Sequence, residues 1–127
     1  MTENELARIV TDAAFRIHYE LGPGLYESVY EEILAHELAK AQLQVERQKP
    51  IGLRWDELSF DAGFRADLIV ENKLLLELKS VDTLAPVHKK QVITYLRLAD
   101  LKLGLLINFG APLIKNGIIR IVNGLQE

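Results

Sequence analysis

The chain has 127 residues, and its 15 basic and 18 acidic side chains give a formal net charge of −3. Hydrophobic residues make up 49% and charged residues 26%, which excludes a disordered, collagen-like or coiled-coil chain. The absence of cysteine excludes disulfide scaffolds, thiolate zinc sites and thiol nucleophiles. The length predicts one domain, 1–127, that is large enough to bury a hydrophobic core. Because no long apolar run and no basic export signal is present, we expect a cytoplasmic protein.

Charge is distributed unevenly along the chain. Residues 1–78 contain 8 basic and 15 acidic side chains, whereas residues 79–127 contain 7 basic and 3 acidic ones. An acidic segment therefore precedes a basic one.

Two helices are predicted in the first third of the chain. Apolar residues at spacings of three and four predict a helix over 3–19, with Thr2 or Asn4 as its cap. This helix ends before 22–24, a Gly-Pro-Gly corner, and a second helix is predicted from about residue 26 to 41. From about residue 43 the period changes to two, which predicts strands over 44–48 and 51–54, with a turn near Trp55.

The rest of the chain predicts strands around one further helix. Strands over 64–70 and 74–81 are joined by a tight turn with Asn72 at its tip. Asp82 or Thr83 opens a helix that has Pro86 in its first turn, and a buried strand follows over 103–109. Because a strand, helix and buried strand form a right-handed crossover, these two strands are parallel. With a last edge strand over 118–122, the order predicts a single α/β domain whose central mixed sheet is flanked by helices.

The tight turn places charged residues together. With Asn72 at the apex, Val70 pairs with Leu74, and Asp67 then lies directly opposite Glu77. Cross-strand partners have Cβ atoms about 5 Å apart, so the two carboxylates repel unless a positive charge lies between them. The period of two places Lys79 on the same face as Glu77.

A divalent cation would resolve this repulsion. We expect the carboxylates of Asp67 and Glu77 and a backbone carbonyl to hold this cation, and such oxygen ligands favour Mg²⁺ or Mn²⁺. Such a cation activates a water, and Lys79 orients that water or stabilises charge on a phosphate. The alternative is a surface hairpin with an ordinary cross-strand Lys-Glu pair. The apolar runs around these charges favour the chemical interpretation.

Two further groups of polar residues are candidates. Glu27 lies near the start of the second helix and shares a helix face with Tyr30. Its alternative role is that of a first-turn acid at the positive helix end. Gln91 and Tyr95 are one helical turn apart, and their alternative is a partly buried helix flank whose polar tips find partners.

Together these residues resemble a known pattern. Residues 24–30, Gly-Leu-Tyr-Glu-Ser-Val-Tyr, resemble the signature of the GxxExxY protein family. Asp67 followed by the run Glu77-Leu78-Lys79 resembles the core of the PD-(D/E)XK nuclease superfamily, although Ala66 stands where that pattern has proline. Residues 91–95 are similar to the QxxxY element of exonuclease-like branches. The resemblance covers about residues 10–123.

The resemblance implies a restriction-endonuclease-like core and a set of site residues. Glu27, Asp67 and Glu77 surround the metal, with the carbonyl of Leu78 as a further ligand, and Lys79 assists the attacking water. The residues that it implies to form the site wall or contact the substrate are Gln91, Tyr95 and Tyr30.

The leading hypothesis is a metal-dependent nuclease that hydrolyses phosphodiester bonds of DNA, or of RNA, through a metal-activated water. The alternative is a non-catalytic module that binds nucleic acid or protein on a nuclease scaffold. It is motivated by the small size and the net acidity, which disfavours binding to phosphates. A structural domain that binds no metal is a third reading. No membrane is expected as a partner, and a homodimer through the edge strand 118–122 is left open.

Overall fold

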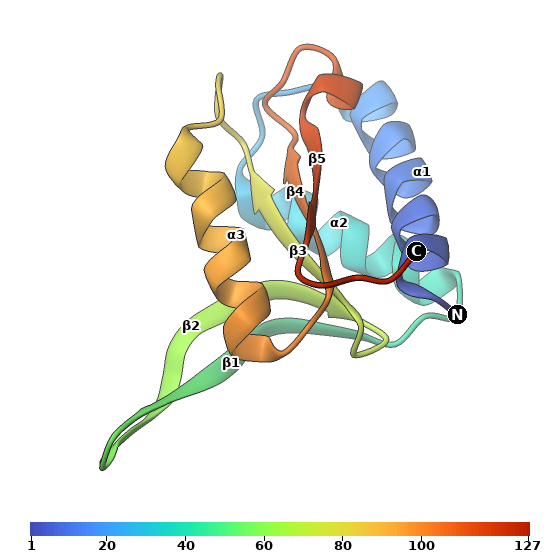
Figure 1. The fold of residues 1–127 in the computed structure, drawn as a ribbon. Helices are drawn as coiled ribbons and strands as arrows, with labels where there is room; N and C mark the ends of the chain where they lie inside the picture. Colours follow the sequence, from blue (N-terminus) through green and yellow to red (C-terminus); the bar gives the residue numbers. More distant parts are fainter.

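The computed structural model describes residues 1–127, and a five-stranded mixed sheet with helices on both faces runs through it (Figure 1). The strands are ordered β1-β2-β3-β4-β5, and every neighbouring pair is antiparallel except β3 and β4, which are parallel as predicted. The predicted fold class is confirmed. The elements are α1 (Glu3–Leu21), α2 (Glu27–Lys40), β1 (Val45–Trp55), β2 (Leu58–Val70), β3 (Leu74–Lys79), α3 (Pro86–Ala99), β4 (Leu103–Asn108) and β5 (Ile118–Val122), with a short 3-10 turn over Ile114–Asn116.

The first two helices begin and end close to where the sequence predicts them. The hydroxyl of Thr2 accepts a hydrogen bond from the backbone N–H of Glu5 at 3.1 Å, which caps α1. Gly22 ends this helix with a φ of 72°, a left-handed conformation that glycine adopts without strain. The corner at residues 22–26 then leads directly into α2.

The third helix corrects one prediction. Neither Asp82 nor Thr83 caps α3, because the helix begins at Pro86 and its N-cap is Ala85. A residue before proline is restricted to extended conformations, and Ala85 has φ −86° and ψ 152°, so the helix cannot start earlier. The backbone N–H of Ala85 donates to His88 Nδ1 at 3.0 Å, which closes this end of the helix.

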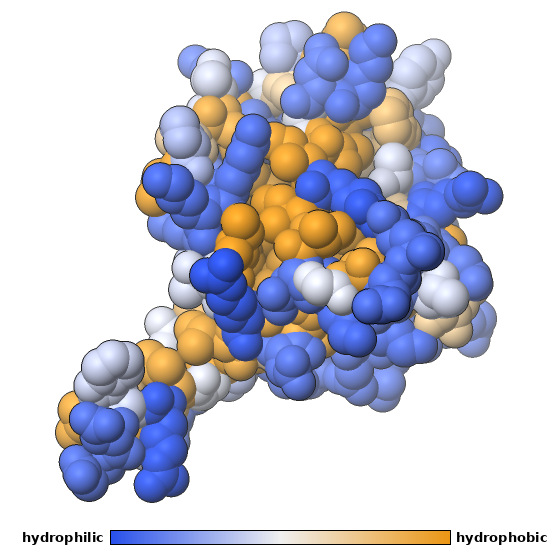
Figure 2. All heavy atoms as spheres, in the orientation of Figure 1, coloured by the Kyte–Doolittle hydropathy of each residue, from blue (hydrophilic) through white to orange (hydrophobic).

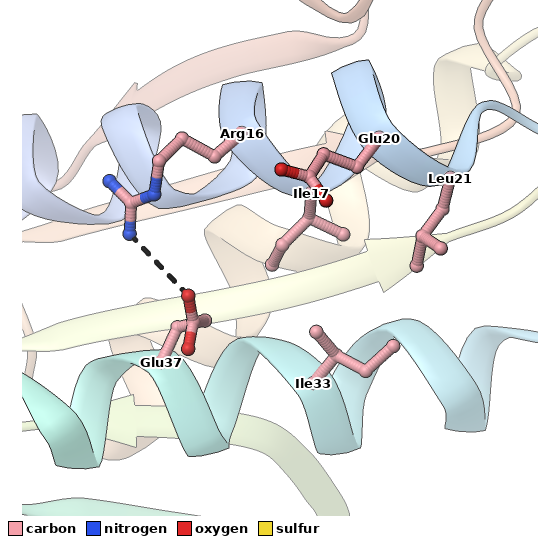
Figure 3. A pocket seen from close by; sticks show the side chains of 6 residues that line it. All are labelled: Arg16, Ile17, Glu20, Leu21, Ile33 and Glu37. Carbon is pink, nitrogen blue, oxygen red and sulfur yellow. Dashed lines mark ion pairs between the residues drawn. The ribbon is translucent and has the colours of Figure 1, made fainter.

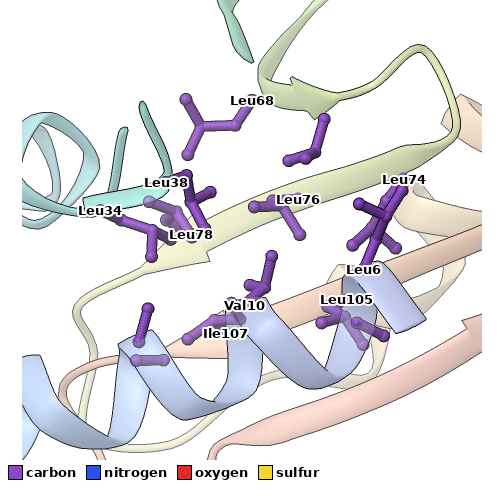
Figure 4. Packing of buried hydrophobic residues seen from close by; sticks show 14 of the residues in the cluster. Leu6, Val10, Leu34, Leu38, Leu68, Leu74, Leu76, Leu78, Leu105 and Ile107 are labelled. Carbon is purple, nitrogen blue, oxygen red and sulfur yellow. The ribbon is translucent and has the colours of Figure 1, made fainter. Parts of the chain in front are cut away.

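Two apolar layers enclose the sheet. The larger cluster has 20 buried residues between one sheet face and the helices α1 and α2, and Figure 4 shows part of this packing. The smaller cluster has 7 buried residues and lies between the other face and α3. All six residues of β4 are buried, as expected of a strand that is covered on both faces. No helix has the length and apolar composition needed to cross a membrane.

The strands β1 and β2 are longer than predicted. β1 runs through Pro50 without a break, and β2 already starts at Leu58, whereas the sequence predicts that strand only from residue 64. The predicted turn is confirmed, since Asp56 adopts a φ of 51° between the paired Trp55 and Leu58. Residues 61–63, Asp-Ala-Gly, have weak strand propensity, so their extended form depends on pairing with β1. The outer part of this hairpin, residues 51–64, stands away from the body and is called the arm below (Figures 1 and 2).

The second hairpin has the predicted register. Val70 pairs with Leu74, Ile69 with Leu75 and Leu68 with Leu76. β3 ends at Lys79, two residues earlier than predicted, and β5 is an edge strand as predicted. The β2–β3 hairpin therefore brings the residues around Asp67 next to those around Glu77.

Candidate functional site

Asp67 and Glu77 lie where the backbone pairing of β2 and β3 ends. The backbone N–H of Asp67 donates to Glu77 Oε1 at 3.3 Å, and the backbone N–H of Leu78 donates to Asp67 Oδ2 at 2.9 Å. Each carboxylate thus accepts a hydrogen bond from the opposite strand, beyond the last backbone pair of the ladder, Leu68 and Leu76. The predicted placement of Asp67 opposite Glu77 agrees with this geometry.

The apolar neighbours of Glu77 determine which face it occupies. Leu76 and Leu78 belong to the cluster beneath α1 and α2, while Leu75 belongs to the cluster beneath α3. Because successive side chains of a strand point to opposite faces, Glu77 projects toward the α3 side. A charged group thus interrupts a strand whose residues 74–78 are all buried.

Burial and like charge shift the titration of both carboxyl groups. Burial, together with the negative charge of Asp67, raises the pKa of Glu77 from 4.5 to about 8. Burial also raises the pKa of Asp67, and the charge of Glu27 adds to this effect. The hydrogen bonds from Leu78 and Gln48, and the charge of Lys79, oppose that rise. Without a cation, burial and the charge of Asp67 therefore favour the protonated form of Glu77.

Lys79 and Tyr95 lie beside this pair. Lys79 is half-buried, and its charge lowers the pKa of both carboxyl groups although it forms no ion pair with either. Burial raises the pKa of Tyr95, and the charges of Glu77 and Asp67 raise it further. The Tyr95 ring stacks on Phe64 of β2, with the ring centroids 3.9 Å apart. Gln91 lies one turn earlier on α3 and is exposed.

Glu27 is less closely associated with the pair than expected. It is the first residue of α2, is exposed, and acts on Asp67 through its charge. No group of three or more His, Cys, Asp or Glu side chains is placed so that it could hold a metal ion. The expected cluster of Glu27, Asp67 and Glu77 is therefore not assembled in advance.

Tyr30 corrects the expectation of a substrate contact. Its side chain is fully buried, and its ring stacks on Phe109 with centroids 4.4 Å apart. The Tyr30 hydroxyl donates to the carbonyl of Gly22 at 2.5 Å and accepts from the backbone N–H of Leu25 at 3.2 Å. Tyr30 therefore holds the corner that leads into α2, and through this corner it places Glu27.

Two polar residues that the sequence does not single out are linked to Asp67, one directly and the other through the first. The side-chain amide of Gln48 donates to Asp67 Oδ1 at 3.1 Å and to Glu31 Oε1 at 2.7 Å. Glu31 is only 7% exposed and also accepts from the Arg47 guanidinium at 3.1 Å. The four-residue spacing from Glu27 to Glu31 was a usable signal for Glu31. No comparable signal marks Gln48, whose φ of 50° belongs to the irregular part of β1 opposite Asp67.

The donor set fits a hard divalent cation. The N–H of Leu78 points toward β2, and in an extended strand the carbonyl of the same residue points to the same side. Two carboxylates and one carbonyl are the oxygen ligands that Mg²⁺ and Mn²⁺ prefer. A cation between Asp67 and Glu77 would also offset the repulsion that raises both pKa values.

The site residues line none of the five cavities of the molecule. A groove of about 310 Å³ between α1 and α2 has an apolar floor that includes Ile17 and Ile33 (Figure 3). The ion pair of Arg16 with Glu37, 3.8 Å long, crosses it. The candidate site lies instead at the end of the β2–β3 ladder, where Glu77 is buried and Asp67 is half-buried.

Comparison with known proteins gives one family. The model of the PD-(D/E)XK nuclease superfamily matches residues 4–121, a range that includes every candidate site residue. Neither the curated proteins nor the solved structures contain a match to the chain.

Proposed function

The chain belongs to the PD-(D/E)XK nuclease superfamily, and we propose that it is a metal-dependent nuclease that hydrolyses phosphodiester bonds of DNA. One observation carries this proposal: the buried carboxyl group of Glu77 and the half-buried carboxyl group of Asp67 lie close together on adjacent strands, with Lys79 beside them. Such perturbed, like-charged pairs cluster at functional sites. We further propose that the chain belongs to the GxxExxY family, whose signature its Gly24–Tyr30 segment resembles.

The cation site is proposed to consist of Asp67, Glu77 and the carbonyl of Leu78, with Glu27 near enough to contribute charge. Mg²⁺ or Mn²⁺ bound there would supply positive charge that stabilises the negative charge developing on the phosphate. Because burial and the charge of Asp67 favour the protonated form of Glu77, cation binding there would be coupled to proton release.

The remaining roles fall to side chains on one side of the sheet. The ammonium of Lys79 is the hydrogen-bond donor that holds the attacking water or a phosphate oxygen. The raised pKa of Tyr95 favours its protonated hydroxyl, which can donate a hydrogen bond to a phosphate oxygen. Gln91, one turn away and exposed, is proposed to contact the nucleic acid backbone.

A cleavage assay tests this proposal. Labelled single-stranded and duplex DNA, and RNA of the same sequence, are incubated with the protein in Mg²⁺, Mn²⁺ or Ca²⁺. We expect cleavage of DNA with Mg²⁺ or Mn²⁺, a loss of at least 100-fold in Asp67→Asn and Lys79→Gln, and wild-type rates in Asp61→Asn. Asp61 is a matched control because it is an exposed aspartate on the arm. Equal rates in all four proteins, with circular dichroism confirming their folding, would reject the assignment.

A non-catalytic binding module is the second candidate. It is favoured by the finding that no cluster of three metal-binding side chains is assembled in advance. Salt-dependent retention of DNA by the protein, without cleavage in any of the three cations, would support this candidate over the nuclease. Calorimetry with Mn²⁺ separates the two candidates further. The nuclease has to bind Mn²⁺ through Asp67, whereas the binding module does not need to bind the cation.

A further inference from the structure

The arm has one apolar face and one polar face. Leu53 pairs with Phe60, and Trp55 pairs with Leu58. Directly paired residues share a face, and so do residues two apart on a strand, so these four side chains lie on one face. Trp55 is 69% exposed, Leu58 58% and Phe60 48%. The opposite face carries the pair Arg54 and Ser59.

The apolar face of the arm continues the smaller core cluster. Ile51 and Phe64, the next pair toward the body, pack against the cluster beneath α3. Beyond them no element covers this face, and Figure 2 shows apolar side chains passing from the body onto the base of the arm. A two-stranded ribbon is at best marginally stable in water unless its apolar face packs against something. A bare face of this kind indicates a protein contact.

The charges of the arm and of α3 indicate which kind of partner the arm binds. The arm carries three exposed acids, Asp56, Glu57 and Asp61, and none of them forms an ion pair. Helix α3 contains no acidic residue, and its cations also form no ion pair; they are Lys89, Lys90 and Arg97. The acidic tip repels phosphates, which disfavours nucleic acid as its partner. The same tip complements α3 of another copy of this chain.

We infer that the arm docks on a second copy of this chain. The two arms lie antiparallel across a two-fold axis with their apolar faces in contact, and the acidic tip of each arm lies against α3 of the other copy. Such an interface is self-complementary, because each copy contributes both the arm and the helix. This inference does not depend on the proposed nuclease activity.

The available area predicts a weak dimer. Trp and Phe side chains bury about 150–250 Å² each, so the exposed parts of Trp55, Phe60 and Leu58 offer on the order of 350 Å² per copy. A standard stable interface buries about 800 Å² per partner. The remainder has to come from α3, where Val87 and Leu98 are exposed beside the cations. We therefore expect a dimer that dissociates on dilution in the micromolar range.

The single tryptophan reports this contact directly. Trp55 is the only tryptophan of the chain, so its emission and its quenching by acrylamide describe the arm alone. We expect the emission to shift to shorter wavelength and quenching to weaken as protein concentration rises, in step with a doubling of mass in sedimentation velocity. Monomeric mass and unchanged emission from micromolar to millimolar protein would overturn the inference.

A charge exchange tests which surfaces meet. The first variant carries Asp56→Lys with Glu57→Lys, and the second carries Lys90→Glu with Arg97→Glu; all four positions are exposed. Each variant alone opposes like charges and should be monomeric, whereas an equal mixture should regain the dimer, because both arm–helix contacts are then complementary. Failure of the mixture to dimerise, while the wild type does, would refute the arm–helix contact.

Two controls complete the experiment. Trp55→Ser should abolish the dimer, and Tyr19→Ser, which changes an exposed aromatic residue on α1, should leave it intact. Single-stranded and duplex DNA are then added to the wild type without divalent cations. If the Trp55 emission shifts with DNA concentration and not with protein concentration, the arm binds nucleic acid instead of a second copy. That result would overturn the inference. Because these readouts need no metal and no cleavage, a failed nuclease assay leaves them unaffected.

Discussion

The side-chain amide of Gln48 donates a hydrogen bond to Asp67 Oδ1 at 3.1 Å, across the β1–β2 ladder. The same amide donates to the buried carboxylate of Glu31 at 2.7 Å, so α2 and β1 together determine where Asp67 points. Residues that orient a ligand in this way contribute to metal affinity without touching the metal.

Shortening this side chain should weaken cation binding. Gln48→Asn keeps the amide and tolerates the left-handed backbone, but it cannot reach both carboxylates. We expect the affinity for Mn²⁺, measured by calorimetry, to fall about 10- to 100-fold. Gln44→Asn, at an exposed glutamine before β1, is the control and should bind as the wild type does. Equal affinities in both variants would show that Gln48 does not position Asp67.

Stability should depend on pH through Glu77. Burial and the charge of Asp67 raise the pKa of Glu77 from 4.5 to about 8 in the folded protein, so folding favours the protonated form. Above pH 4.5 the unfolded chain loses this proton first, and the free energy of unfolding falls, by at most about 1.4 kcal/mol per pH unit, until about pH 8. Glu77→Gln should reduce this dependence, leaving only the smaller part that comes from the raised pKa of Asp67, and should unfold at higher urea than the wild type at pH 8.

Added Mg²⁺ provides the control for this prediction. It should raise the urea midpoint of the wild type at pH 8 and leave that of Glu77→Gln almost unchanged, because ligands stabilise only the state that binds them. An equal loss of stability in both proteins between pH 5 and pH 8 would contradict the assignment to Glu77.

Tyr30 should affect stability and not substrate affinity. Tyr30→Phe keeps the ring on Phe109 but removes the two part-buried hydrogen bonds that its hydroxyl makes with the carbonyl of Gly22 and the N–H of Leu25. We expect a loss of about 1–3 kcal/mol in the free energy of unfolding, measured in urea. In the cleavage assay KM should stay at the wild-type value. A raised KM with unchanged stability would contradict this prediction and would indicate that Tyr30 contacts the substrate.

Leucine truncations should separate the core from the arm. Leu76→Ala empties a fully buried position between the sheet and the helices α1 and α2 (Figure 4) and should cost about 2–5 kcal/mol in urea denaturation. Leu58→Ala, on the exposed face of the arm, should cost under about 1 kcal/mol in dilute, monomeric protein. Similar losses in both variants would mean that the arm is part of the cooperative core.

Local patterns were sufficient for the presence and order of the three helices, although not for the start of α3, and for the parallel pair β3 and β4 and the β2–β3 register. A short turn determines register because it leaves few ways of pairing its strands, and this is why Asp67 and Glu77 could be placed opposite each other from the sequence. The periodicity of α2 places Tyr30 on the same helix face as Glu27. Periodicity, however, gives only the side of the helix on which a residue lies, and not how deeply that residue is buried. Only the packed structure places the Tyr30 ring on Phe109 and leaves Glu27 in solvent.

The amino-acid sequence by itself thus determined the α/β architecture and the carboxyl pair Asp67 and Glu77, because both follow from neighbours a few residues apart. Tertiary structure decided the length of the arm and the contacts of Gln48 and Glu31. Those features depend on how β1 pairs with β2 and packs against α2, across an irregular ladder with a register shift between Ile51 and Leu53. Such long-range pairing is set by the packing of the whole sheet, which no single stretch of sequence encodes.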